Sequence, residues 1–282
     1  MTYMTLAPRP WRIAAFCTAI GLFVSACATI PSDTELQATR DECSQFRQPF
    51  VDIARERNAR IQTWASTGAA AGAGAGALIA RSRGDNPLAG ALIGSLIGGA
   101  TGAVAGYYSD LQRRSNTTAG LRSSINSDAS RDLRQADRLS SNLSSLNACR
   151  LRQIAAVESS VRQGGDRAAA QSTLHRIRTN VRLDNRIVDG VVGDLTRTRN
   201  VYVGALGQTG ADTDSFVSSI QRYQPQVATP QRTALRVNTS QRPRTNNPVA
   251  NLGYAEKELS AGAKAHAASV DARIDAVDAL LI

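Results

Sequence analysis

The side chains best suited to chemistry are few in this 282-residue sequence, which holds two histidines and four cysteines. His175 and His266 stand far apart in segments with helical patterns, so we expect each at a surface or a helix interface. The sequence has no GxSxG, P-loop or HExxH motif, and no CxxC or Cys/His cluster that could hold zinc. We therefore predict a protein that is not an enzyme and that needs neither a metal nor another cofactor.

Residues 1–26 have the features of a secretory signal peptide, with two arginines, no acid and an apolar run. The end of this segment, Val24-Ser25-Ala26-Cys27, resembles the bacterial lipobox, in which the cysteine is lipidated and becomes the mature N-terminus. The resemblance implies that Cys27 carries palmitate-type acyl chains and that residues 27–33 form a lipidated tether. Ala28 follows where an inner-membrane lipoprotein would have Asp, so the resemblance implies a bacterial outer-membrane anchor with the protein mostly facing the periplasm. The alternatives are an ordinary cleavage site and an uncleaved anchor helix.

Cys43 and Cys149 are the two cysteines that remain after Cys17 and Cys27 are accounted for. An even pair in an oxidising compartment predicts a disulfide, and two buried free thiols are the alternative. Straight helices on either side of the chain's apolar centre would place the two residues about 30 Å out of register. A helix break at residues 115–120 could repair part of this mismatch.

The formal net charge is +10, and it falls to +8 without Arg9 and Arg12, because residues 1–26 contain no acid. Basic and acidic residues are interspersed and aromatic residues make up only 5%, so we expect no nucleic-acid partner. A basic exported chain could instead bind membrane lipid, peptidoglycan or lipopolysaccharide.

Apolar periodicity predicts an all-α fold that combines long amphipathic helices in an antiparallel helical bundle or coiled coil. An amphipathic helix is expected over 34–64, capped by Asp33, with the RERNAR run (55–60) largely on its solvent side. A helical hairpin domain is expected over 108–206, with helices at 121–161 and 166–202 joined by a glycine turn. Residues 207–252 are predicted to form a flexible, disordered linker and 253–282 a C-terminal helix.

Glycine recurs at every fourth position in the stretch 88–108, which has no charged residue for 21 positions and would rise about 31 Å as a helix. Each glycine costs about 1 kcal/mol in an aqueous helix, so five in line indicate a smooth face for close helix packing, as in membrane hairpins. We predict a glycine-zipper membrane hairpin over 65–107 with helix-packing residues Gly68, Gly72, Gly76, Gly90, Gly94, Gly98, Gly102 and Gly106. A soluble helical pair inside an oligomer and a low-complexity loop are the alternatives.

Cys27 and residues 65–107 together resemble the bacterial glycine-zipper outer-membrane lipoproteins of the SlyB and OsmB type. The resemblance implies a role in envelope structure or integrity, through self-association as a homo-oligomer or through binding of other envelope proteins. The alternative is a component of a secretion or transport assembly, or an oligomeric pore-former. Only Ser95 and Thr101 offer polar side chains within 88–106, so the sequence favours the first function.

Overall fold

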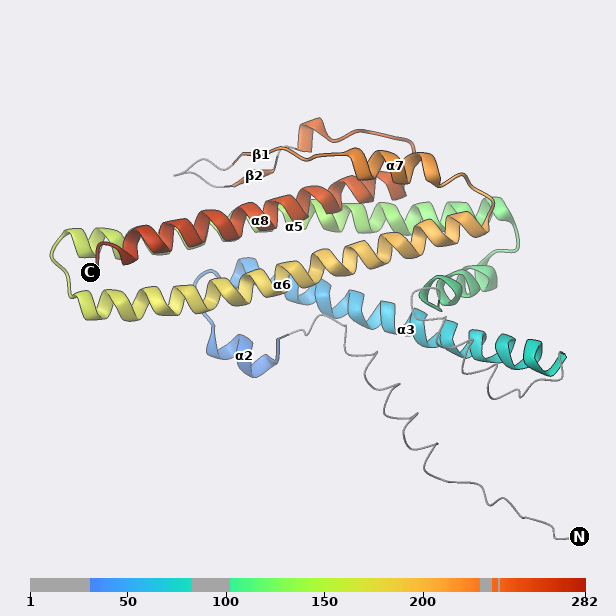
Figure 1. Ribbon diagram of the computed structural model, residues 1–282, viewed down its shortest axis with the longest axis horizontal. Helices are drawn as coiled ribbons and strands as arrows, with labels where there is room; N and C mark the ends of the chain where they lie inside the picture. The colour runs from blue at the N-terminus through green and yellow to red at the C-terminus, as the bar shows by residue number, and fades with distance from the viewer. Residues whose placement is uncertain (1–30, 83–101, 229–234, 238) are drawn as a thin grey trace, which may run out of the picture.

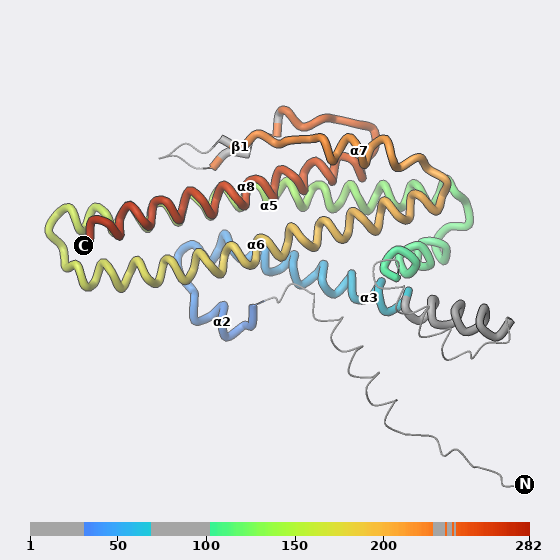
Figure 2. The backbone as a smooth tube through the Cα atoms, in the orientation of Figure 1, coloured from blue at the N-terminus to red at the C-terminus, as the bar shows by residue number. Residues whose placement is uncertain are grey.

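The computed structural model describes residues 31–82, 102–228, 235–237 and 239–282. Over these residues the fold is all-α apart from one short strand pair (Figure 1). Three long helices form the bundle: α5 (Thr118–Arg162), α6 (Arg167–Gln208) and α8 (Pro248–Asp278). Figure 2 shows the chain reversing between them, so that α6 runs antiparallel to both α5 and α8. The all-α bundle predicted from the apolar stripes is confirmed.

Local signals place the ends of these helices close to where the sequence predicted them. The Asp166 side chain accepts hydrogen bonds from the amides of Ala168 and Ala169 and so caps α6. Gly164 has φ +81°, a left-handed conformation that glycine adopts at little cost, and it ends the α5 side of the turn. Asn247 caps α8 directly before Pro248, which suits the first helical position because it has no N–H to leave unpaired.

The expected single helix over 34–64 is wrong, because the chain breaks between α2 (Asp33–Ala38) and α3 (Ser44–Ser82). Ser32, not Asp33, caps α2 through a hydrogen bond from the amide of Glu35. In the break, Asp41 accepts hydrogen bonds from Cys43 N and Ser44 Oγ at 3.1 Å, and its other oxygen is bonded by side chains of α5 and α6. These long-range hydrogen bonds stabilise the break between α2 and α3, because a continuous helix could not place Asp41 against both α5 and α6.

The predicted linker over 207–252 carries regular structure where it is described. It contains α7 (Asp214–Arg222), the antiparallel strands β1 (Val227–Ala228) and β2 (Arg236–Val237), and a 3-10 turn at Thr239–Gln241. Ile220 is buried against Ala250 and Tyr254, and the Lys257 ammonium donates to the carbonyl oxygens of Gln221 and Tyr223. The expectation of a flexible linker is therefore corrected for these residues, because α8 supplies partners that the local sequence does not reveal.

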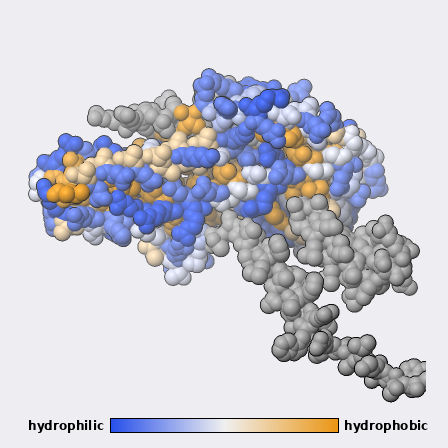
Figure 3. Space-filling model, in the orientation of Figure 1, coloured by the Kyte–Doolittle hydropathy of each residue, from blue (hydrophilic) through white to orange (hydrophobic). Residues whose placement is uncertain are grey.

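α3 lies against α5 and α6, on the side of those helices that α8 leaves free. Its apolar residues Phe50, Val51, Ala54 and Trp64 join the main core cluster. A second cluster fills the far end of the bundle, where α5, α6 and α8 pack without α3. Polar residues cover most of the face seen in Figure 3, with small apolar areas between them. Among the described residues, no helix is both long and apolar enough to cross a membrane.

Candidate functional site

Two backbones touch where α3 meets the helical segment 102–114, at the base of the predicted glycine hairpin. A Cβ added to Gly68 would lie 1.7 Å from the carbonyl oxygen of Gly102, and one added to Gly106 would lie 2.0 Å from that of Trp64. No side chain fits at such distances, so these glycines are required for the contact. We call Trp64, Gly68, Gly102 and Gly106 the hairpin base.

Only part of the predicted glycine line can be placed. Gly72 and Gly76 lie further along α3, whereas Gly90, Gly94 and Gly98 lie outside the described residues, as does most of the predicted 88–108 span. The described glycines contact one another within a single chain. The smooth face predicted from the spacing is therefore used, at least at its base, to close a hairpin.

Three aromatic rings attach the hairpin base to the bundle. The ring centroids of Trp64 and Tyr107 are 4.8 Å apart, and that of Tyr202 on α6 lies 5.3 Å from Tyr107. The Tyr107 hydroxyl donates to Asp128 Oδ2 at 2.9 Å, which bonds the segment 102–114 to α5. Tilted aromatic pairs with satisfied hydroxyls stabilise a contact beyond the area that they bury. The hairpin base is thus tied to two bundle helices by directional contacts.

Next to the aromatic rings, one buried carboxylate on α5 accepts hydrogen bonds from two side chains and forms an ion pair with a third. Asp132 accepts from Arg60 at 3.1 Å and from the Tyr202 hydroxyl at 2.8 Å, and the Arg57 guanidinium lies 3.3 Å away. Burial lowers the pKa of Arg57, while burial and the Asp132 charge raise the pKa of the Tyr202 hydroxyl. Arg57 is fully buried, so the expected solvent exposure of the RERNAR run is wrong at this residue. Arg57 lies seven residues from both Phe50 and Trp64, a spacing that could have placed it on the buried face.

A second buried carboxylate, Asp184 on α6, joins α3 to α5. It accepts from Arg150 Nε at 2.7 Å and from Arg47 Nε, and all three side chains are almost completely buried. Arg150 also pairs with Asp41 of the α2–α3 break. Burial opposes the ionisation of Asp41, but the hydrogen bond and charge of Arg150 outweigh it, so the pKa of Asp41 is lowered. The sequence alone does not reveal this network, because each of its members taken singly has the pattern of a solvated charge.

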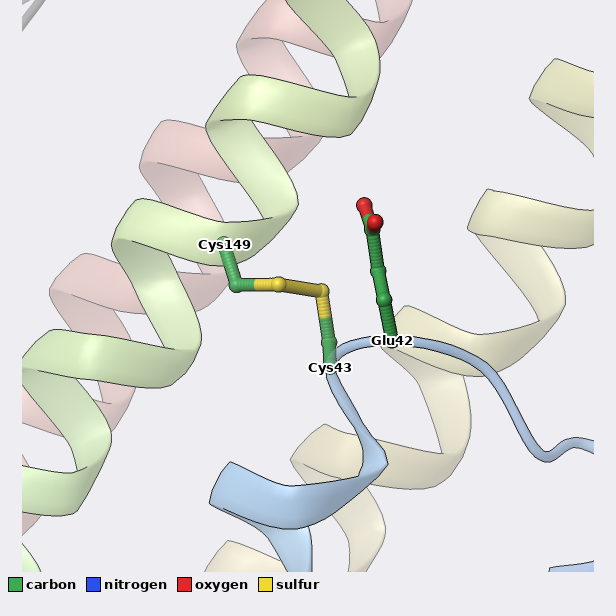
Figure 4. Close-up of side chains that lie close together, drawn as sticks. All are labelled: Glu42, Cys43 and Cys149. Carbon is green, nitrogen blue, oxygen red and sulfur yellow. A yellow bond between two sulfur atoms is a disulfide. The ribbon is translucent and has the colours of Figure 1, made fainter.

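Cys43 and Cys149 are joined by a disulfide, with their Cα atoms 5.8 Å apart (Figure 4). The register problem is solved by two breaks: residues 115–117 interrupt the helical path before α5, and Cys43 lies outside α3. Glu42 extends alongside the sulfur pair, and potential ligand atoms of the three residues lie within 4.8 Å of one another. Because the sulfurs are bonded to each other, the cluster offers no thiolates to a metal.

The two histidines lie on different helices. His175 is exposed on α6, whereas His266 is completely buried on α8, with Nδ1 3.0 Å from Asn147 Nδ2. Burial lowers the pKa of His266 to about 4, so the ring is neutral near pH 7. The Asn147 oxygen accepts from the amide of Leu235 at 3.2 Å, which extends this polar cluster to the segment before α8.

The described part of the chain combines a helical bundle with a close-packed glycine hairpin base. Residues 67–113 match the family model described as a glycine zipper, the one for outer-membrane (Omp) proteins. No curated protein and no solved structure matches the chain. The matched residues contain the contact among Gly68, Gly102 and Gly106, and the match indicates an outer-membrane-associated protein.

Proposed function

We propose that this chain is a non-enzymatic, lipid-anchored outer-membrane protein that uses its glycine-zipper hairpin to hold a periplasmic helical bundle at the membrane. Its role is in envelope structure or integrity, through self-association or through binding of other envelope proteins. The observation that carries the proposal is the backbone contact of Gly68 with Gly102 inside the matched zipper segment. The hydrophobic effect contributes little to helix association in a membrane, because lipid tails are as apolar as the helix side chains. Small residues favour association there because they allow two helix backbones to approach closely.

The fold-back of α2 supports attachment of Cys27 and the hairpin to one membrane. A straight helix from 34 to 64 would carry the N-terminus about 46 Å away from the hairpin. Instead, Asp33 pairs with Arg55 of α3, and Glu35 pairs with Arg186 of α6 at 2.8 Å. Asp33 therefore lies at the level of Arg55, about 14 Å along the helix axis from Trp64.

The tether is long enough to cover this distance. Residues 27–33 span about 20 Å when fully extended, which exceeds the 14 Å or so between the Arg55 and Trp64 levels. A lipid on Cys27 and a hairpin that enters the bilayer near Trp64 are thus compatible with one membrane. The bundle end near Gly164 then points away from that membrane.

Fatty-acid labelling tests the lipid anchor. We expect the wild-type protein to incorporate an alkyne-bearing fatty-acid analogue, and the Cys27→Ser variant to show no incorporation and to accumulate as an unprocessed precursor. The Cys17→Ser variant is the matched control, since that cysteine lies inside the signal segment. Equal labelling of Cys27→Ser and wild type would refute lipidation at Cys27.

Extraction tests the hairpin separately. After enzymatic removal of ester-linked acyl chains, we expect the wild-type protein to stay in the membrane pellet at alkaline pH. Release under these conditions would show that the hairpin is not in the bilayer. Ion leakage from liposomes that contain the purified protein would favour the pore-former instead.

A further inference from the structure

A polar pocket lies between α5 and the segment that leads into α8. Its volume is about 500 Å³, which is within the range of small-ligand sites. Ser140, Ser141 and Ser144 line it on α5, and Arg242 and Arg244 line it on the opposite segment. We call it the serine pocket. Most of its lining residues are polar, so it suits a polar ligand.

The α5 wall of the serine pocket accepts hydrogen bonds. Ser140 Oγ donates to the carbonyl oxygen of Ala136 at 3.2 Å, and Ser144 Oγ donates to that of Ser140 at 3.1 Å. Ser141 Oγ likewise donates to the carbonyl oxygen of Asp137 at 3.4 Å. Each hydroxyl has only one proton, so these oxygens have only lone pairs left, and lone pairs accept hydrogen bonds. A ligand on this wall must therefore bring donors.

The opposite wall carries a positive charge that no carboxylate balances. Three charged residues line the serine pocket, and two of them, Asp137 and Arg242, pair with each other at 2.8 Å. Arg242 also pairs with the buried Glu258. The third, Arg244, is exposed and forms no ion pair within the part of the chain that the structure describes.

Two more guanidinium groups flank the serine pocket on α5. Arg134 lies one helical turn before Asp137, and Arg138 lies one turn before Ser141. Both are exposed, and neither has an ion-pair partner among the described residues. The arginines in and beside the pocket thus outnumber the carboxylates, which favours an anionic group in the ligand.

We propose that the serine pocket binds an acidic saccharide. The sugar hydroxyls donate to the serine oxygens of α5, and the acidic group pairs with Arg244. A phosphate or carboxylate ion alone would leave the serine wall without donors, whereas a neutral sugar would leave Arg244 without an anion. An acidic saccharide satisfies both walls at once.

The place of the serine pocket in the fold selects the source of the saccharide, and this step rests on the proposed function. Asp128 accepts from Tyr107 beside the hairpin base, and Ser140 lies about 18 Å further along the axis of α5. The headgroup layer of a bilayer is only about 5–8 Å thick. With the hairpin in the membrane, the pocket therefore faces the periplasm beyond the headgroups. The ligand is then a muropeptide unit of the cell wall, which carries sugar hydroxyls and carboxylates on one molecule.

Calorimetric titration of the full-length protein in detergent tests the ligand. We expect saturable binding of soluble disaccharide-peptide fragments of the cell wall, with an affinity that falls as salt rises, since Arg244 is exposed. The neutral disaccharide chitobiose and inorganic phosphate should each bind about tenfold more weakly or worse, because each satisfies only one wall. No binding of the fragments, equal binding of all three probes, or tighter binding of the core oligosaccharide of lipopolysaccharide would overturn the proposal. The titration needs no bilayer, so its failure is distinct from failure of the lipid anchor or of the hairpin.

Variants locate the binding in the serine pocket. Arg244→Gln should weaken binding of the fragments about tenfold and reduce its salt dependence, because a charge-assisted hydrogen bond is lost. Arg113→Gln is the matched control, since Arg113 is exposed in the segment 102–114 and does not line the pocket.

The serine wall has its own matched control on the same helix. Ser141→Ala with Ser144→Ala removes two acceptors and should also weaken binding about tenfold. Ser145→Ala should have no effect, because its hydroxyl donates to the carbonyl oxygen of Ser141 in the same way but does not line the pocket. Alanine favours a helix, so these variants keep the fold, and their urea midpoints verify this. If the pocket variants bind the fragments as tightly as their controls do, the saccharide does not occupy the serine pocket.

Discussion

Gly106 faces the main-chain carbonyl of Trp64 so closely that a Cβ at residue 106 would lie 2.0 Å from that oxygen. The relationship joins the last glycine of the predicted zipper to the last aromatic residue of the α3 core stripe. The aromatic ring cluster begins at the same place, because the Trp64 ring packs at a tilt against the ring of Tyr107, the residue next to Gly106. The hairpin and the bundle thus share one packed joint.

Replacement of Gly68 by alanine should destabilise this joint. The new Cβ would lie 1.7 Å from a backbone oxygen, which cannot move as a flexible side chain can, so the helices must separate. We expect a loss of about 1–3 kcal/mol of unfolding free energy, as for overpacked cores. Gly207→Ala is the control: nothing lies within 4 Å of its added Cβ, so the helix gains up to about 1 kcal/mol. Urea unfolding in detergent measures the unfolding free energy of both variants. If Gly68→Ala and Gly207→Ala change this free energy equally, the close contact at Gly68 does not stabilise the fold.

Loss of the disulfide should lower stability substantially. The bond closes a loop with a sequence separation of 106, which in the chain-entropy model stabilises the fold by about 4–5 kcal/mol. Cys43→Ser and Cys149→Ser should each lose most of this free energy, and the double variant should lose little more. Urea midpoints provide the measurement. If reduction leaves the gel mobility of the wild-type protein unchanged, and if both cysteines of the unreduced protein react with an alkylating reagent, the disulfide is not present.

Removal of the charge on Asp132 should cost far more than removal of a surface charge. Asp132→Asn leaves the fully buried Arg57 without its counter-charge, which we expect to cost about 3–5 kcal/mol. Asp110→Asn, which breaks the exposed pair with Arg114, should cost less than about 1 kcal/mol. Adding Arg57→Met to Asp132→Asn should recover part of the loss, because it removes the uncompensated charge. If Asp132→Asn and Asp110→Asn unfold at the same urea concentration, the buried ion pair of Arg57 and Asp132 does not stabilise the fold more than the exposed pair does.

His266 should make the fold less stable as the pH falls. Its pKa is about 4 in the fold and near 6.5 in the unfolded chain, so between these values the unfolded state takes up a proton that the folded state does not. From pH 7 to pH 5 this one group should cost about 2 kcal/mol. The neighbouring Asp184 and Arg150 act on the ring in opposite directions, so burial dominates.

The matched variant for this pH effect is His266→Asn, which keeps an acceptor for Asn147 but does not titrate. Its unfolding free energy should be lower at pH 7 and should fall less between pH 7 and pH 5 than that of wild type. Parallel pH profiles of the two proteins would exclude His266 as the source.

The sequence by itself predicted the parts of the fold that depend on local pattern. Apolar residues such as Leu139 and Leu195 recur at helical spacing, so the existence of α5, α6 and α8 could be predicted. The ends were less exact: α6 ends at Gln208 where 202 was expected, and α8 begins at Pro248 where 253 was expected. Gly164 and Asp166 mark helix ends because their backbone or capping chemistry acts on adjacent residues. The start of α8 at Pro248 was not predicted, because residues 207–252 have the composition of a linker. The glycines at every fourth position likewise predicted a close-packed face, because their alignment on one side follows from the geometry of a single helix.

Only the tertiary structure decided which charges are buried and where the N-terminal helix breaks. Arg47, Arg57 and Arg150 look solvated in the sequence, and they are buried because Asp132 and Asp184 approach them from other helices. The break before α3 depends on Asp41, whose partner Arg150 lies 109 residues away. A buried charge is stable only when a partner compensates its lost hydration, and that partner is known only after the helices have packed.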